Sequence, residues 1–324
     1  SIQANEKHTT YAAMMRLGLP VPDTWMLPPK EYEPTNDLQV TLERYAKIFS
    51  LKTVGEKVGY PAFIKPYDGG AWVGVSKVDN AEELGKAYDG SGKRIMHLQK
   101  AVAPFDLFVR AVGVGPQVHL MKYDPGAPLH DRYKVAFDFV NAEEWQHMAN
   151  MCLTINSFFG WDFNSCEALR QDGVFYPIDF ANACPDSQVT SLHFHFPWLV
   201  KAKLKWSLFV AATRRRMRKN LDWEPFFDIA SSGASFKEKL PLYARLAHQR
   251  FESDRFAGQL PHLDEVAWEF FGTTTAKEAV RAKVAALFPA HEVEEFTEHF
   301  WGLVQFWRRT ESEYIAKSGT PTPA

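Results

Sequence analysis

The stretch from Tyr60 to Val75, YPAFIKPYDGGAWVGV, constrains this chain more than any other. The apolar run 62–64 predicts a short strand that presents Lys65, and Pro66 ends it because proline cannot donate to a ladder. The turn that follows contains Gly69, Gly70 and Gly74. Backbone N–H groups without a Cβ nearby can approach a ligand closely, and the lysine adds a positive charge. The pattern favours a polyphosphate site, and the alternative is a tight hairpin with an exposed lysine.

The composition is that of an ordinary globular protein. The 324 residues suffice for two or three structural units, and 46% of them are hydrophobic. A formal net charge of -2 argues against a general nucleic-acid binder. The sequence has neither a signal pattern nor an apolar run of the roughly 18 residues that span a membrane. The three cysteines form no C-x-x-C pair, so we expect reduced thiols and a cytoplasmic protein.

Helices that alternate with antiparallel strands predict an α+β fold for the first 190 or so residues. The clearest helices are expected at 5–17, 41–58 and 141–159, and strands are expected at 95–98, 107–114 and 117–123. Asp172-Gly173 is a strong turn signal and predicts a hairpin of strands 162–169 and 174–180. The two strands of this hairpin carry the acids Glu167 and Asp179, which the turn brings towards each other.

From about His193 the sequence predicts mostly helix, with aromatic residues at helical spacing that we expect in a core. The expected helices are 197–220, 236–256, 263–271, 275–287 and 291–317. Between Pro197 and Leu221 there are eight Lys or Arg and no acid, which indicates either a solvated face or a wall for an anionic substrate. We therefore predict three domains, at 1–98, 99–195 and 196–324.

Acids and an amide late in the α+β part suit a metal ion. Glu167, Asp179 and Asn182 offer the hard oxygen ligands that Mg²⁺ prefers. Asp179 lies among apolar residues and needs a partner or a cation there. Taken alone, Glu167 fits an exposed strand residue equally well. Lys7 alone would be an ordinary surface lysine.

The order of these parts resembles the ATP-grasp superfamily over about residues 4–190. The matching pieces are NEKHTTYAAMMRLGLPVP, VGYPAFIKP with DGGAWVGV, LQKAV, CEA and IDFANACP. Their order and spacing carry the resemblance, and no single motif does. The fold that it implies is two α+β subdomains that clamp ATP, followed here by an additional helical region.

The resemblance also implies roles for single residues. Lys7 and Lys65 would contact the nucleotide phosphates, beneath a loop that includes Gly69, Gly70 and Gly74. The segment with Gln99, Lys100 and Val102 would be the hinge that reads adenine, mostly through backbone groups. Asp106 would hold the ribose hydroxyls. Arg132 or Lys134 would contact the γ-phosphate or an acyl phosphate. Glu167, Asp179 and Asn182 would bind Mg²⁺, with Mn²⁺ as an alternative.

Three features depart from the family pattern. The last acid usually stands two residues before the asparagine, and Asp179 stands three before Asn182. A shift of one residue reverses the face of a strand, so either a bulge corrects it or one residue is not a ligand. Trp72 occupies a loop position where small residues are usual. Members commonly carry a small α/β domain before the first helix, and this sequence starts too close to that helix to show one.

The function that the resemblance implies is an ATP-dependent ligase that joins a carboxylate to an amine through an acyl phosphate. Lys65, Arg132 and Lys134 would stabilise charge on the transferred phosphoryl group, without a protein nucleophile. The expected partners are small-molecule or peptide carboxylates and amines, without nucleic acid or membrane, and a homodimer stays open. The alternatives are a kinase of the same fold and a nucleotide-binding regulatory protein without turnover.

Overall fold

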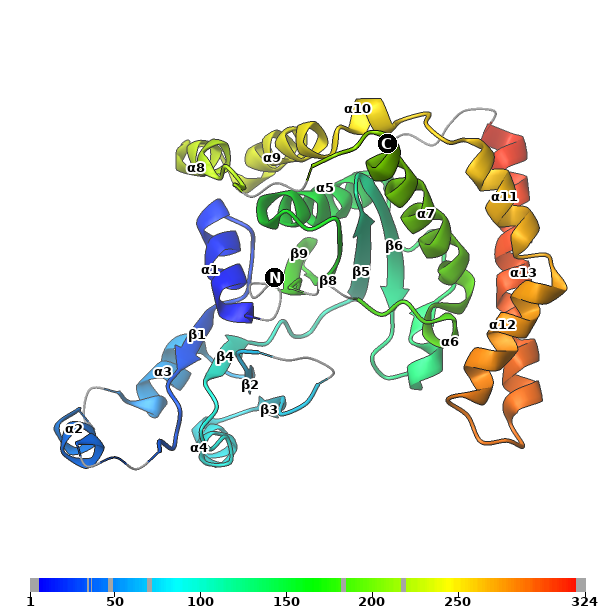
Figure 1. Cartoon of the computed structure of the whole chain (residues 1–324). Helices are drawn as coiled ribbons and strands as arrows, with labels where there is room; N and C mark the ends of the chain where they lie inside the picture. Colours follow the sequence, from blue (N-terminus) through cyan, green and yellow to red (C-terminus); the bar gives the residue numbers. More distant parts are fainter. Residues whose placement is uncertain are drawn as a thin grey trace. The chain divides into compact units, whose positions relative to one another are not determined.

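The computed structural model describes residues 6–33, 35, 37–45, 49–68, 72–181, 185–216 and 220–318 (Figure 1). The chain divides into two compact units. The first unit contains Ser1–Leu107 and Glu167–Asn182, and the second contains Phe108–Cys166 and Ala183–Ala324. The predicted three-domain boundaries stay a prediction. The α+β class and the helical character of the C-terminal region are confirmed.

The first unit is built on an antiparallel sheet flanked by helices. Its elements are α1 (Lys7–Leu17), β1 (Thr24–Leu27), α2 (Leu38–Tyr45), α3 (Leu51–Val58), β2 (Ala62–Pro66), β3 (Ser76–Val78), α4 (Ala81–Asp89) and β4 (Met96–Lys100). The four strands have the order β1-β4-β2-β3. A hairpin of β8 (Phe163–Gln171) and β9 (Val174–Asp179) contributes its residues from Glu167 onward. Asp172 and Gly173 have φ angles of 51° and 76°, so the predicted turn is confirmed.

The helix expected at 41–58 is wrong as a single element, because the structure has two helices there. The second of them, α3, begins after Ser50, whose side-chain oxygen accepts a hydrogen bond from the Thr53 backbone N–H. A serine in this position satisfies a backbone donor that has no partner inside the helix, and so favours a new helix start. The sequence prediction of one helix over 41–58 did not take the Ser50 cap into account.

The two faces of the β2–β4 pair have different characters. Ile64 and Leu98 are paired and belong to an apolar core beneath α3 and α4. Since side chains alternate along a strand, Lys65 and its partner His97 lie on the opposite face, together with Gln99. The helix α1 packs on that polar face, where the His8 and His97 rings are 5.1 Å apart. Lys65 is therefore held between the sheet and α1.

The second unit carries the remaining strands and most of the helices. They are β5 (Leu107–Val114), β6 (Gln117–Tyr123), η2 (Leu129–Asp131), β7 (Tyr133–Lys134), α5 (Ala142–Phe159), α6 (Val189–Leu192), η3 (His193–His195), α7 (Phe196–Ala212), α8 (Glu224–Ser231), α9 (Phe236–Phe251), α10 (Ser253–Phe256), α11 (His262–Phe270), α12 (Thr274–Ala285) and α13 (Val293–Ser318). The sheet order is β7-β6-β5-β8-β9, and the division between the units falls within β8. Among these helices, η2, α6 and α8 have no counterpart in the sequence prediction.

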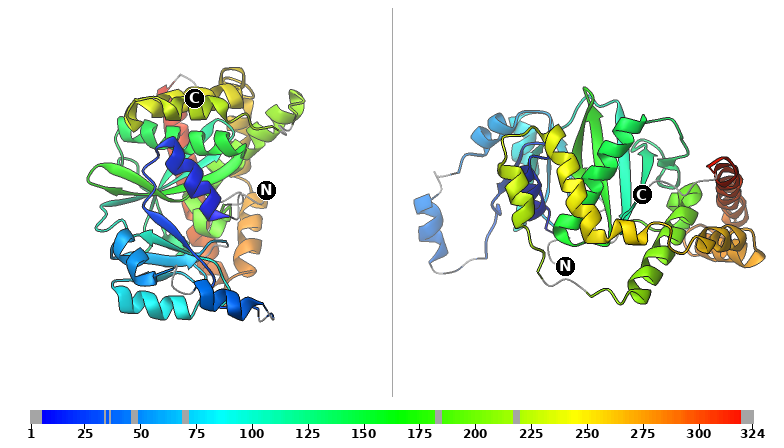
Figure 2. Two further views of the ribbon diagram at one scale, coloured as in Figure 1. Left: turned by 90° about the vertical axis from the view of Figure 1, so that its left-hand side faces the viewer. Right: turned by 90° about the horizontal axis from the view of Figure 1, so that it is seen from above.

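Helix packing against α5 and α7 forms the core of the second unit. Figure 2 shows α9 running beside α5, whose start is a complete capping box of Asn141 and Glu144. Trp206 on α7 is buried with Phe209, Phe251 and other rings, as expected for the aromatic residues of this region. No helix among the described residues is long and apolar enough to cross a membrane.

Two lysines of the basic stretch are engaged inside this helical region. Lys201 and Lys205 on α7 both pair with Asp264 on α11, at 3.2 and 2.9 Å, and Lys201 also pairs with Glu311 on α13. The side chains of Lys201 and Lys205 are only 12% and 16% exposed. For these two residues, charge pairing between helices is the observed role, rather than a solvated face or a wall for a substrate.

We expect Gly115→Ala to destabilise the second unit strongly. Gly115 has a φ of 57°, and an added Cβ would lie 2.4 to 2.8 Å from the Trp206 ring. Strain plus overpacking predicts a loss of about 2–4 kcal/mol in the free energy of unfolding, measured by urea denaturation. Gly173→Ala is the matched control, since its φ is 76° but nothing lies within 4 Å, and we expect about 1 kcal/mol. Equal losses for both variants would contradict the role given to Trp206.

Candidate functional site

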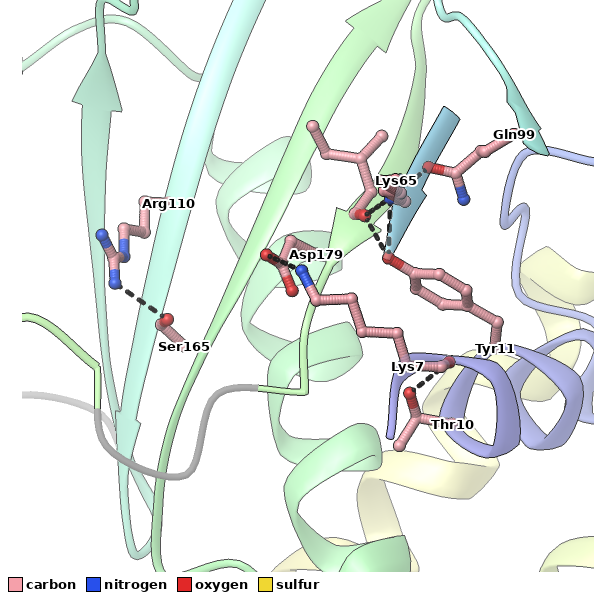
Figure 3. A network of polar contacts seen from close by, with 9 residues as sticks. Lys7, Thr10, Tyr11, Lys65, Gln99, Arg110, Ser165 and Asp179 are labelled. Atoms are coloured by element: carbon pink, nitrogen blue, oxygen red, sulfur yellow. Dashed lines mark hydrogen bonds and ion pairs between the residues drawn. The ribbon is translucent and has the colours of Figure 1, made fainter. Parts of the chain in front are cut away.

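The ammonium group of Lys65 is the centre of a buried polar network in the first unit (Figure 3). Its Nζ donates to the Tyr11 hydroxyl at 3.0 Å, to Gln99 Oε1 at 2.8 Å and to the Ile178 carbonyl at 3.4 Å. The Tyr11 hydroxyl donates in turn to the same carbonyl at 2.7 Å. The three protons of the ammonium thus meet three neutral acceptors, from α1, β4 and β9.

Burial weakens the charge of this lysine. Lys65 is 8% exposed, and its desolvation lowers the pKa to about 8 from the ordinary value of 10.5. The nearby Asp179 carboxylate opposes this fall in the pKa, the Lys7 ammonium adds to it, and Glu167 opposes it more weakly. A phosphate group placed here would favour the protonated form, because it adds negative charge beside the ammonium.

Lys7 is the first residue of α1 and reaches the acidic hairpin. Its Nζ lies 3.0 Å from Asp179 Oδ2 (Figure 3). Its backbone N–H donates to the Tyr67 carbonyl at 2.9 Å, which ties the start of α1 to the chain just after β2. The structure therefore brings both predicted phosphate lysines close to Asp179 on β9.

The strand register places Glu167 directly opposite Asp179, as the hairpin predicts. The next pair is Ala168 with Pro177, so Ile178 is an extra residue on β9 and forms a bulge beside Asp179. This bulge precedes Asp179, and the spacing to Asn182 remains open because Asn182 lies outside the described residues. The metal assignment of these three residues stays a prediction.

One oxygen of Asp179 supports a cation at this position. Asp179 Oδ1 is buried and has no hydrogen-bond partner among the described residues, which is costly for a carboxylate. With Glu167 opposite, the donor set is hard oxygen and fits Mg²⁺. The described residues contain no group of three His, Cys, Asp or Glu that could hold a metal by itself. A further ligand has to come from Asn182, from the nucleotide or from water.

The glycine loop is described only in part, since Gly69 and Gly70 lie outside the described residues. Gly74 has a φ of 74°, and an added Cβ would lie 2.8 Å from Arg94 Nη1 and 3.0 Å from Pro66 Cγ. This position therefore requires glycine. Trp72 also has a positive φ, 63°, and is 61% exposed. An exposed indole on a strained backbone is unusual and marks the loop as a candidate for ligand contact.

The predicted hinge segment contacts Lys65 through the side chain of Gln99. The Gln99 side chain links Lys65 to the Thr24 hydroxyl, which lies 2.7 Å from its Nε2. The Lys100 N–H donates to the Asp23 carbonyl. The predicted adenine contacts of Gln99, Lys100 and Val102 stay a prediction, and the Gln99 side chain has the additional role of orienting Lys65.

Asp106, the predicted ribose ligand, is paired with Arg170 in this structure. Arg170 Nη2 and Nε lie 2.9 and 3.2 Å from Asp106 Oδ2, and Nε lies 3.1 Å from Oδ1. These hydrogen bonds hold the pKa of the Asp106 carboxyl below its usual range. A ribose hydroxyl would have to share the carboxylate with this guanidinium.

Arg132 and Lys134 belong to the second unit. Arg132 Nε donates to the Ala127 carbonyl at 3.1 Å, and Lys134 Nζ lies 2.6 Å from Asp131 Oδ2. The His195 ring contacts the Lys134 carbonyl at 3.2 Å through Nε2. Their predicted contact with a phosphate stays a prediction, and neither residue is distinguished from the other by these local contacts.

Sequence reasoning missed two site residues, Tyr11 and His97. Tyr11 lies in the expected helix 5–17, and its hydroxyl accepts a hydrogen bond from Lys65 and orients it. His97 is fully buried opposite Lys65, and neither ring nitrogen has a hydrogen-bond partner among the described residues. Burial, followed by the charges of His8 and the two lysines, lowers the pKa of His97 to about 3, so it is neutral. Strand alternation from Gln99 could have indicated His97.

Comparison with known proteins connects this site to one family. The sequence model described as D-ala D-ala ligase C-terminus matches residues 14–97, which include Lys65. Residues 14–97 are therefore similar to the C-terminal part of D-alanine–D-alanine ligases. A D-alanine–D-alanine ligase of Lactobacillus acidophilus is 33% identical over 88 residues, which are 27% of this chain and 22% of that relative. The chain thus matches about a fifth of the length of this ATP-grasp relative, and the predicted resemblance is confirmed.

Solved structures of D-alanine–D-alanine ligases are more distantly similar. The enzyme from Bacillus anthracis complexed with ATP is 16% identical, with a TM-score of 0.47 over 66% of this chain and 68% of that one. The enzyme from Helicobacter pylori is 15% identical, with a TM-score of 0.44 over 63% of this chain and 59% of that one. The roles of single residues in this chain therefore have to be argued from its own contacts.

The pH dependence of stability should report the burial of Lys65. Because its pKa is about 8 in the folded protein and 10.5 ordinarily, the unfolded chain binds more protons between these pH values. The free energy of unfolding should therefore rise with pH in that window, by about 3 kcal/mol relative to Lys65→Met. Below pH 8 the difference between the two proteins should be constant. Urea unfolding of both at pH 7 to 10.5 measures this, and a difference that stays flat throughout would contradict the burial argument.

Proposed function

We propose that this protein is an ATP-dependent ligase that joins a carboxylate to an amine. The observation that carries the proposal is the meeting of Lys7 and Lys65 with Glu167 and Asp179 in one unit. Two ammonium groups beside a pair of carboxylates suit a metal-bound polyphosphate better than any neutral ligand. The ATP-grasp assignment of residues 14–97 supports the same reaction class.

The nucleotide would be held by residues of the first unit. Lys7 and Lys65 would bind its phosphates under the glycine loop, the segment from Gln99 to Val102 would face the adenine, and Asp106 would hold the ribose. Glu167, Asp179 and Asn182 would hold Mg²⁺. That ion supplies charge neutralisation for the phosphates of the nucleotide. The unpartnered oxygen of Asp179 supports the metal part of this proposal.

The reaction would proceed in two transfers. A carboxylate oxygen attacks the γ-phosphorus of ATP, which releases ADP and leaves an acyl phosphate. The amine then attacks the acyl carbon, loses a proton and displaces inorganic phosphate, which leaves an amide. Lys65 would stabilise the charge on the phosphoryl oxygens. Cys152 is not a candidate nucleophile, because burial raises the pKa of its thiol to about 12.

The substrates that we propose are small amino acids. The relatives named above are D-alanine–D-alanine ligases, whose name gives one amino acid as both acid and amine. Extension of this substrate class to the present chain is a proposal, because the match covers only 22% of the curated relative. Peptides with a free carboxylate or amine belong to the same chemical class and are part of the test.

The test is a substrate panel read by ADP release and by mass spectrometry of the products. We expect ADP and inorganic phosphate with at least one pair of amino acids, together with an amide product. Lys65→Met should lower nucleotide affinity at least about tenfold in calorimetry, because a buried charge is lost from the phosphate site. A phosphorylated alcohol or guanidine as the product would indicate a kinase instead. ATP binding without ADP across the panel would indicate a regulatory protein.

Asp179→Asn should separate metal-dependent turnover from nucleotide binding. The amide keeps the size of the side chain but removes the negative charge that holds Mg²⁺. We expect turnover to fall about a hundredfold, which corresponds to about 2.7 kcal/mol in barrier height, while nucleotide affinity changes less. Circular dichroism controls for folding. Equal losses of binding and turnover in an unfolded variant would indicate a structural acid.

A further inference from the structure

The ion pair of Lys7 and Asp179 joins two groups that the proposed function assigns to other partners. Lys7 Nζ lies 3.0 Å from Asp179 Oδ2, and the two side chains are 12% and 33% exposed. The proposed nucleotide site needs the Lys7 ammonium on a phosphate, and the proposed metal site needs the Asp179 carboxylate on Mg²⁺. In this structure the ion pair therefore engages both the lysine proposed for the phosphate and the carboxylate proposed for the metal.

The surroundings of Asp179 disfavour a lone cation. The Lys7 ammonium contacts the carboxylate directly, and the Lys65 ammonium is near enough for the charges of Lys7 and Asp179 to act on its pKa. A divalent ion that approached Asp179 alone would meet both positive charges. Lys7 contacts Oδ2 of the carboxylate, whereas the buried Oδ1 has no hydrogen-bond partner among the described residues.

Lys7 is the more exchangeable of the two lysines. Lys65 is fixed by three neutral acceptors on three elements, whereas the Lys7 ammonium contacts one side chain among the described residues, that of Asp179. The backbone of Lys7 is anchored to the Tyr67 carbonyl, beside the start of the glycine loop. A rotation of the Lys7 side chain can therefore release Asp179 while the backbone at the start of α1 stays anchored.

We propose that Lys7 excludes divalent cations from Asp179 until a polyphosphate draws its ammonium away, so that metal and nucleotide bind together. The inference rests on the proposed nucleotide site. Charge is conserved in the exchange, because one pair, Lys7 with Asp179, becomes two pairs, Lys7 with phosphate and Asp179 with the metal. The protein alone binds the metal weakly, and the same side chain that prevents its binding becomes a phosphate ligand.

The test measures Mn²⁺ binding to the full chain without nucleotide, by the electron paramagnetic resonance signal of free Mn²⁺. We expect Lys7→Met to bind Mn²⁺ about tenfold or more tightly than the unmodified protein, because a contacting positive charge is removed. Lys7→Arg keeps that charge and should bind as weakly as the unmodified protein. Lys86→Met is the matched control, since Lys86 is an exposed lysine paired with Glu82 on α4, and it should leave the affinity unchanged.

A double variant locates the added metal. Lys7→Met with Asp179→Asn should lose the gain in Mn²⁺ affinity, because the carboxylate that Lys7 covered is gone. Unchanged affinity in Lys7→Met, or a gain that survives in the double variant, would overturn the proposal. If Lys7→Met does not fold by circular dichroism, Lys7→Gln gives the same readout with a polar side chain.

Nucleotide binding by the unmodified protein separates this inference from the proposed function. Calorimetry with ATP and Mg²⁺ should show binding, and its absence would refute the proposed function together with the exchange. Binding of ATP with no effect of Lys7→Met on Mn²⁺ affinity would refute the exchange alone. Tighter Mn²⁺ binding by Lys7→Met, lost in the double variant, supports the exchange by a readout that does not depend on turnover.

Discussion

The site in the first unit depends on one buried ammonium group and its three acceptors. Lys65 stands on β2, and its partners come from Tyr11 on α1, Gln99 on β4 and the carbonyl of Ile178 on β9. A buried charge is stable only where its protons are accepted, so these contacts fix the packing of α1 and the hairpin against the sheet. The position of Lys7 follows, because Lys7 and Tyr11 are one helical turn apart.

Charge balance explains the other unusual groups around Lys65. Lys7 is paired with Asp179, and His97, which lies on β4 opposite Lys65, stays neutral, since burial lowers its pKa to about 3. A third positive charge in this space would have no carboxylate to offset it. These charges suit a ligand with several negative charges together with a cation. Asp179 Oδ1, which has no hydrogen-bond partner among the described residues, is the observation that best supports the cation.

Local signals in the sequence were sufficient for several elements. Asn141 and Glu144 indicate the start of α5, because a capping box acts within one helical turn. Asp172-Gly173 indicates the turn of the β8–β9 hairpin, because few other residues tolerate its positive φ angles. The hairpin in turn placed Glu167 opposite Asp179. The sequence prediction missed the division of 41–58 into α2 and α3, because it did not use Ser50 as a helix cap. The partnership of Arg170 with Asp106 had no local signal.

The sequence alone determined the kinds of group available and their order: a lysine before a glycine turn, a hinge, and two acids on one hairpin. These depend on spacing along a strand or within a turn, which backbone geometry fixes. Only the tertiary structure decided that Lys7 meets Asp179 across 172 positions and that the Tyr11 hydroxyl accepts a hydrogen bond from Lys65. Such contacts depend on how α1 packs on the sheet, and that packing is set by burial and charge summed over the unit, which no short stretch of sequence contains.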